Sequence, residues 1–262
     1  MHHDHAVARV ALVTGASRDI GRATAIRLAH DFSTVAIVAR SAEGLAGTAD
    51  AIRAAGAQPF ALPIDLRQSG AAGQAVLDTV SALGRLDAVA AIAGDVSQKG
   101  LFELNDQDWH DSLMLKFHAM RRLMIAAWPH LRQSGGAVVI TSGTTAFAPK
   151  ADFAAVGAIN AMILSVARCF AEVGQADGVR VNTVSPGPVM TDRRRAMLAR
   201  YALSHGLTEQ EALDHFTRNN GISRFGRPEE LAEVFAWLVS PAASWICGSN
   251  IRIDGGEVKM AL

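Results

Sequence analysis

Short runs of β-branched and apolar residues alternate with longer amphipathic stretches along nearly the whole chain. This alternation limits the fold more than any other feature. Strand, helix and strand in succession are typical of βαβ units, which build a parallel sheet covered by helices on both faces. We therefore expect an α/β protein with a doubly wound sheet in a single domain. Strands are predicted at 10–13, 34–38, 58–64, 88–92, 137–141, 179–184 and 250–253, and helices at 21–30, 42–55, 74–83, 109–131, 153–173 and 229–239.

The composition disfavours several classes of partner. Half of the 262 residues are hydrophobic and 19% are charged, which is enough material for a sizeable core. Lys+Arg and Asp+Glu both number 25, and this balance argues against nucleic acid or an acidic membrane surface as a partner. No apolar run is expected to reach the roughly 18 residues of a membrane span, and no signal peptide is expected before the first strand.

The cysteines and the N-terminus complete this picture. Cys169 and Cys247 lie far apart in the chain, which favours two buried free thiols in a reducing compartment, the cytoplasm. Residues 1–6, with three histidines, are predicted to be a frayed tail ahead of one domain at 7–262. No metal site is predicted.

The turn after the first predicted strand is rich in glycine and leads into a helix. It reads Thr14-Gly15-Ala16-Ser17-Arg18-Asp19-Ile20-Gly21. Glycines here let backbone amides approach a pyrophosphate, whose charge the helix N-terminus favours. A tight turn without a ligand would need similar residues, but the position in the first βα unit favours a dinucleotide site.

This turn resembles the TGxxxGxG motif of the short-chain dehydrogenase/reductase family, and further segments resemble that family's signatures across residues 7–257. The resemblance implies a Rossmann-type fold, an oxidoreductase acting on a small molecule, and a homotetramer built on 109–131 and 153–173. A hetero-oligomer with an active homologue is the alternative. The matching segments are Asp65-Leu66, Ala93-Gly94, Asn182 with Ser185-Pro186-Gly187, Gly226-Arg227-Pro228-Glu229-Glu230 and Asp254-Gly255-Gly256.

The residues after the second predicted strand indicate NADP(H) as the cofactor. NAD-dependent proteins of this fold usually have a carboxylate here that binds the ribose 2′-hydroxyl. This chain has Ala39 followed by Arg40, and Arg40 with Arg18 could pair with a 2′-phosphate. The cofactor-binding residues implied by the resemblance are Gly15, Ser17, Arg18, Ile20, Gly21, Arg40, Asp65, Leu66, Gly94, Asn160, Gly187 and Thr191.

Asp19 departs from the family motif, because it replaces the middle glycine. A carboxylate near a pyrophosphate is unfavourable unless it points away. Asp tolerates left-handed backbone better than most residues, and it could instead cap the following helix.

The family's Ser, Tyr, Lys and upstream Asn are missing from the positions that the resemblance assigns to them. An alignment without gaps puts Gly143 at the Ser, Val156 at the Tyr, Asn160 at the Lys and Lys116 at the Asn. A valine cannot transfer a proton, and Tyr201 is the only tyrosine in the chain. Reduction of simple ketones by the family mechanism is therefore not expected.

Four polar residues near these positions remain candidates for catalysis: Ser142, Lys116, Asp152 and Asn160. Three also have structural interpretations, with Ser142 bonding at a strand end, Lys116 as a surface or ion-paired residue and Asp152 capping the long helix. Residues 187–225 are expected to form the substrate loop with small helices. Three consecutive arginines at 193–195 could meet an acidic substrate or simply be a solvated helix start.

Three functions are compatible with these residues. A reductase of an imine, an iminium or an activated alkene needs no phenol, because hydride delivery and positioning supply much of the rate. A non-redox enzyme such as a cyclase or lyase could reuse the fold. A catalytically silent binding or regulatory subunit is the third possibility, since fold alone does not fix function.

Overall fold

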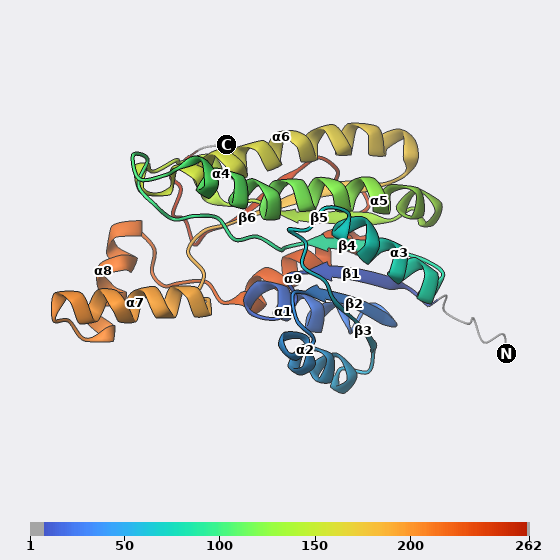
Figure 1. Cartoon of the computed structure of the whole chain (residues 1–262), viewed down its shortest axis with the longest axis horizontal. Helices are drawn as coiled ribbons and strands as arrows, with labels where there is room; N and C mark the ends of the chain where they lie inside the picture. The colour runs from blue at the N-terminus through green and yellow to red at the C-terminus, as the bar shows by residue number, and fades with distance from the viewer. Residues whose placement is uncertain (1–7, 261–262) are drawn as a thin grey trace.

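A seven-stranded parallel sheet forms the centre of the molecule (Figure 1). The structure is a computed structural model and describes residues 8–260, so the predicted tail at 1–6 lies outside it. The strands are β1 (Val10–Thr14), β2 (Thr34–Ala39), β3 (Gln58–Pro63), β4 (Ala88–Ala91), β5 (Ala137–Thr141), β6 (Arg180–Pro186) and β7 (Asn250–Ile253). Their order in the sheet is β3-β2-β1-β4-β5-β6-β7. The predicted doubly wound α/β fold is confirmed.

Burial explains the apolar strands that the sequence displays. Every residue of β1 and β4 is buried, because helices cover both faces of the sheet centre. β3 at the edge is more exposed and carries Pro59 and Pro63, which an edge strand tolerates. The strand order reverses between β1 and β4, and ligands of such sheets bind outside the carboxyl ends at this point.

Two helical layers pack on the sheet (Figure 1). One face is covered by α1 (Asp19–Leu28), α2 (Ala42–Ala54) and α9 (Pro228–Val239), which contribute Leu28, Ile52 and Phe235 to one apolar cluster. The other face is covered by α3 (Ala71–Leu83), α5 (Ala119–Ser134) and α6 (Ala154–Asp177), which contribute Val76, Leu123 and Ile163 to a second cluster.

The long helix predicted at 109–131 is present, but it contains a π-helical turn that the sequence did not predict. It consists of α4 (Asp106–Ser112), a π-helical turn (Leu113–His118) and then α5. Asn105 caps α4 through a reciprocal pair of hydrogen bonds with Asp108. A π turn re-aims the side chains around it and is often found at functional sites. This turn carries Lys116.

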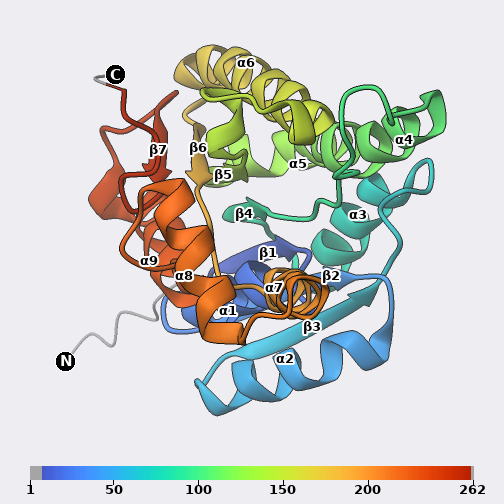
Figure 2. The same ribbon diagram turned by 90° about the vertical axis from the view of Figure 1, so that its left-hand side faces the viewer.

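The segment at 187–225 contains α7 (Asp192–His205) and α8 (Glu209–Asn220) beyond the carboxyl ends of the strands. Figure 2 views the molecule from that end and shows both helices in front of the sheet. They enclose a small apolar cluster of their own around Leu198 and Phe225. A β-bridge between Val189 and Gly226 holds the two ends of the segment together.

Helix α6 is the longest helix among the described residues. Together with the turn before it, residues 151–177, it is long and apolar enough to cross a membrane, although 33% of its most apolar window is buried in the protein. Its buried side packs into the core through Ala155, Ile159, Ile163 and Ala167. Its other side leaves Met162 and Val173 exposed.

The two cysteines are free, but the prediction that both are buried is wrong. Cys169 is exposed on α6, because it faces away from the sheet. Cys247 is partly buried, and its Sγ donates to the carbonyl of Ala171 at 3.7 Å.

Candidate active site

Close packing explains two glycines of the turn after β1. Gly15 has a φ of 71°, and a Cβ there would come within 2.9 Å of Ala93 Cα. A Cβ on Gly21 would collide with the carbonyl oxygen of Gly15. The N-terminus of α1 is thus held tightly against the turn, with its first amides directed outward, which is the arrangement that favours an anionic group.

Asp19 connects this turn to the substrate segment. Its φ is 49°, so the expected left-handed backbone is present. The expected helix cap is not: α1 has no side-chain cap, and Asp19 Oδ1 instead accepts a hydrogen bond at 2.8 Å from the amide of Asp192. That amide belongs to the first turn of α7, where negative charge is favoured. The carboxylate therefore points toward α7 and away from the amides of α1.

Charged side chains follow β2 and β3 at the carboxyl edge of the sheet, where the glycine turn after β1 also lies. Arg40 and Arg18 are exposed. Asp65 accepts three hydrogen bonds from the guanidinium of Arg67, the shortest at 2.6 Å. Arg67 holds the pKa of Asp65 below its ordinary value, with a smaller contribution from Arg40. This edge therefore presents three arginines and one carboxylate that is already paired.

Lys116 lies against Gly94. A Cβ on Gly94 would lie 2.9 Å from Lys116 Cδ, so glycine leaves the space that the lysine fills. Lys116 Nζ donates to the carbonyl of Ser142 at 3.4 Å. Burial lowers the pKa of Lys116 to about 8, and no carboxylate of the described residues offsets it. The interpretation of Lys116 as a surface or ion-paired residue is wrong, because the lysine is partly buried at the cavity and pairs with no carboxylate of the described residues.

The end of β5 and the start of α6 meet at Asn160. Ser142 is buried and its hydroxyl donates to the Asn160 carbonyl at 3.0 Å, as a strand-end structural bond. Asn160 Nδ2 donates to Thr145 Oγ1 at 2.9 Å, and a Cβ on Gly143 would lie 2.5 Å from that nitrogen. Asn160 Oδ1 is buried and has no hydrogen-bond partner among the described residues. It is an acceptor that a bound hydroxyl would satisfy.

No tyrosine lines this region. Val156 faces the cavity, whereas Tyr201 lies in α7, where its hydroxyl is 3.1 Å from His215 Nε2 and its ring stacks on His205. Asp152 is exposed in a 3₁₀ turn and does not line the cavity. The prediction that Asp152 caps α6 is wrong, because Phe153 occupies the N-cap position.

The remaining predicted cofactor residues lie around the same edge. A Cβ on Gly187 would lie 2.6 Å from Asp254 Cβ, so two loops meet closely there. Thr191 caps α7 by accepting from the Arg194 amide at 3.2 Å. Ile20 and Leu66 pack into the two apolar clusters, while Ser17 is partly exposed.

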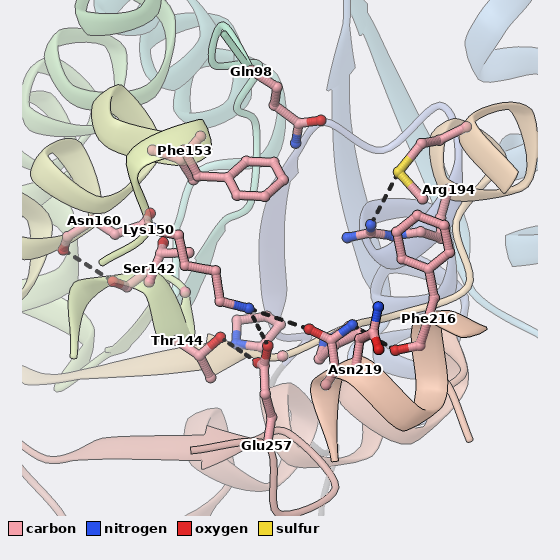
Figure 3. A pocket seen from close by; sticks show the side chains of 18 of the residues that line it. Gln98, Ser142, Thr144, Lys150, Phe153, Asn160, Arg194, Phe216, Asn219 and Glu257 are labelled. Carbon is pink, nitrogen blue, oxygen red and sulfur yellow. Dashed lines mark hydrogen bonds and ion pairs between the residues drawn. The ribbon is translucent and has the colours of Figure 1, made fainter. Parts of the chain in front are cut away.

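A cavity of about 400 Å³ joins these elements, within the size range of small-molecule sites (Figure 3). Lys116, Gly143, Val156 and Asn160 all line it. Part of its far wall comes from the segment predicted as the substrate loop, through Arg194, Met197, Phe216, Asn219 and Asn220. The sequence did not predict the contribution of Gln98, Lys150, Phe153 and Glu257.

Glu257 closes the floor of this cavity from the C-terminal segment. Its carboxylate accepts from Thr144 at 2.9 Å and from Lys150 at 3.3 Å, and Lys150 also donates to Asn220 at 3.2 Å (Figure 3). Residues 8–260 bring no three His, Cys, Asp or Glu side chains together as a metal site.

The family model described as enoyl-(acyl carrier protein) reductase matches residues 15–257. The chain belongs to the short-chain dehydrogenase/reductase family. It is therefore an NAD(P)-binding oxidoreductase by descent, with the Rossmann-type fold that the sequence predicted.

Relatives of the chain cover it almost completely. It is 30% identical over 258 residues to versicolorin reductase 1 of Aspergillus parasiticus, covering 96% of this chain and 97% of the relative. It is 29% identical over 248 residues to the short-chain reductase protein NovJ of Streptomyces niveus, covering 95% and 93%. The crystal structure of L-sorbose reductase from Gluconobacter frateurii, complexed with NADPH and L-sorbose, superposes with a TM-score of 0.92 at 26% identity and 97% coverage of both chains.

Proposed function

We propose that this protein is a cytoplasmic NADP(H)-dependent reductase of an activated alkene, in which Lys116 replaces the phenol of its family. The observation that carries this proposal is the Lys116 ammonium. It lines the same cavity as Gly143, Val156 and Asn160, with its pKa lowered to about 8. A group whose pKa is close to the operating pH is suited to general acid catalysis.

The residues at the carboxyl edge fit the dinucleotide. The glycine cradle of Gly15 and Gly21 would hold the pyrophosphate, and Asn160 Oδ1, buried without a partner, would accept from a ribose hydroxyl. Arg40 and Arg18 would pair with the 2′-phosphate. Similar proteins support this choice, since the L-sorbose reductase structure holds NADPH.

The chemistry assigned to Lys116 follows from where charge develops. When bound, NADPH supplies a hydride. Reduction of a double bond conjugated to a carbonyl leaves negative charge on the carbonyl oxygen, several bonds from the carbon that is reduced. An ammonium that comes from the π turn, and not from the Val156 position of α6, can stabilise that oxygen and deliver a proton. In a ketone the two reacting atoms are adjacent, so the donor would have to stand where Val156 is.

The charges of the cavity favour the alkene over the iminium. Lys116, Lys150 and Arg194 line the cavity, and the carboxylate of Glu257 is already bound by Lys150 and Thr144. A cationic substrate would be repelled by this excess of positive charge, because Coulomb interactions are strong where water is scarce. A substrate that becomes anionic during the reaction is stabilised by it.

Cofactor titration followed by a substrate panel tests this function. We expect NADPH to bind, and its consumption to be faster with enones than with cyclic imines or simple ketones. Binding of NADPH without turnover on any substrate would favour a silent regulatory subunit. If NADPH does not bind, a non-redox enzyme such as a cyclase or lyase replaces the proposal.

The preference for the phosphorylated cofactor should depend on Arg40. Arg40→Ala should weaken NADPH binding by roughly 1–3 kcal/mol, the size of a lost charge-assisted contact, and should leave NADH binding nearly unchanged. Calorimetric titration of both cofactors measures this. Arg53→Ala is the control, because Arg53 is an exposed arginine on α2 that pairs with Asp50. Equal affinity of the native protein for NADPH and NADH would refute the preference.

We also expect a homo-oligomer, with four subunits as the proposed number. Ile125 on α5 and Met162 and Val173 on α6 are exposed apolar side chains on two neighbouring helices. Such a surface favours self-association. Light scattering at micromolar concentration should give a multiple of the 27.7 kDa chain mass, whereas a monomer would contradict the expectation.

A further inference from the structure

The arginine run at 193–195 separates into three different environments. Arg193 pairs with Asp95 at 2.7 Å and donates to the Val96 carbonyl at 3.3 Å. Arg195 is exposed. Arg194 instead reaches into the cavity, where Figure 3 shows its guanidinium on the side opposite Phe153. Only one of the three arginines is therefore directed at the site.

Arg194 has no anionic partner among the described residues. Its guanidinium donates to the thioether of Met197 at 3.3 Å, which is a weak acceptor, and lies 5.7 Å from the centre of the Phe225 ring. Glu257 is the carboxylate of the cavity, but Thr144 and Lys150 already bind it. A guanidinium stays charged in proteins, so this positive charge is left uncompensated.

Two further observations make that charge costly. Burial lowers the pKa of Arg194, with a smaller opposing effect from Glu257, so surrounding protein excludes part of the water that would solvate it. Arg194 also lies in the first turn of α7, where the helix dipole disfavours a cation. Arg194 is thus a cation partly removed from water at a helix N-terminus, and its presence there is explained if a ligand supplies the missing anion.

The other residues that line the cavity near Arg194 indicate the chemistry of the rest of that ligand. Phe153, Val156, Met197 and Phe216 give the cavity apolar surfaces, and Gln98 adds a polar group. In Figure 3 the rings of Phe153 and Phe216 face the cavity from opposite sides. One guanidinium matches one carboxylate through two parallel hydrogen bonds.

We propose that the substrate is a carboxylate with an apolar, aryl-sized body, and that Arg194 binds its carboxylate while Phe153 and Phe216 enclose the body. This inference rests on the proposed function for the position of the reacting double bond. An enone that carries a carboxylate, such as benzoylacrylate, has the required groups. Arg194 then fixes one end of the substrate and Lys116 faces its ketone oxygen.

Binding of an unreactive probe tests Arg194 without using turnover. Benzoylpropionate, the saturated analogue, and its methyl ester are titrated calorimetrically into the NADPH-loaded protein. The acid should bind more tightly than the ester. Arg194→Gln should weaken the acid roughly 10- to 100-fold and leave the ester and NADPH unchanged. Arg195→Gln, one residue along the same helix turn, should change none of the three affinities.

Each other outcome has a defined meaning. Equal binding of acid and ester by the native protein overturns the proposal. So does an Arg194→Gln variant that loses NADPH affinity but not acid affinity, because the arginine would then bind the cofactor.

Arg194→Lys keeps the positive charge but loses the paired geometry, so this variant should bind the acid with intermediate affinity. Melting temperatures confirm that the variants fold. The same titrations without NADPH remain decisive if the cofactor does not bind. If the acid binds through Arg194 but benzoylacrylate is not reduced, the carboxylate site stands and the proposed reductase function fails.

Discussion

Replacing Lys116 with methionine should lower kcat for enone reduction by roughly 100-fold or more and leave the affinity for NADPH unchanged. Methionine keeps the length of the chain that packs over Gly94 but carries no proton and no charge. The loss should fall on kcat, because the ammonium acts on charge that develops during the reaction. NADPH consumption on an enone, with cofactor titration on the same samples, measures both quantities.

The pH dependence identifies the group that is lost. Burial lowers the pKa of Lys116 from 10.5 to about 8, so the native rate should fall as the pH rises through about 8 and the ammonium is deprotonated. The Lys116→Met variant should lack this decline. Lys99→Met is the control, because Lys99 pairs with Asp108 outside the cavity. A decline that survives in Lys116→Met would assign the proton to another group.

Stability should change with pH for the same reason. The unfolded chain keeps its lysine pKa near 10.5, whereas the folded chain has a pKa of about 8 at Lys116. Between these values the unfolded state binds more protons, so the contribution of Lys116 to the free energy of unfolding rises with pH in that window. Denaturant unfolding of the native chain and of Lys116→Met, compared at the two ends of the window, isolates this contribution.

The sheet could be predicted from the sequence because its cause is local. Strands buried on both faces are apolar along nearly their whole length, and this holds for β4 and for β1 up to its last residue, Thr14. The glycine turn could be predicted for a similar reason. Gly15 and Gly21 are only a few residues apart in the chain and lie in contact, so their spacing in the sequence is enough to predict the turn.

The substrate loop at 187–225 could be predicted, but the contacts that join it and the C-terminal segment to the site could not, because they connect distant parts of the chain. Thr144 meets Glu257 across 113 residues, and the Asp19 carboxylate meets the Asp192 amide across 173. Consecutive residues of a helix point about 100° apart, so the three arginines of the run cannot all face the site. Only the packing of α7 shows that Arg194 is the one that does.

The proposed loss of the family's catalytic groups leads to a second large effect. The native chain should reduce simple ketones poorly, and Val156→Tyr alone should not rescue it, because an unperturbed phenol has a pKa of about 10 and is a weak catalyst at neutral pH. Gly143→Ser alone should destabilise the protein by roughly 1–3 kcal/mol, since its Cβ would lie 2.5 Å from Asn160 Nδ2. Asn160→Lys removes that amide, so the two changes should be tolerated better together than Gly143→Ser alone.

The fourfold variant Gly143→Ser, Val156→Tyr, Asn160→Lys and Lys116→Asn should therefore gain ketone reduction that no single change produces. The four groups act as a unit, so their effects should be strongly non-additive. The same variant should lose enone reduction with its Lys116, which separates a rebuilt mechanism from a general increase in activity. NADPH consumption on matched enones and ketones, for the native chain, the Val156→Tyr variant and the fourfold variant, gives both rates. Brisk ketone reduction by the native chain would contradict this account. It would mean that Lys116 can protonate an oxygen next to the reduced carbon, so that a ketone needs no proton donor at the position of Val156.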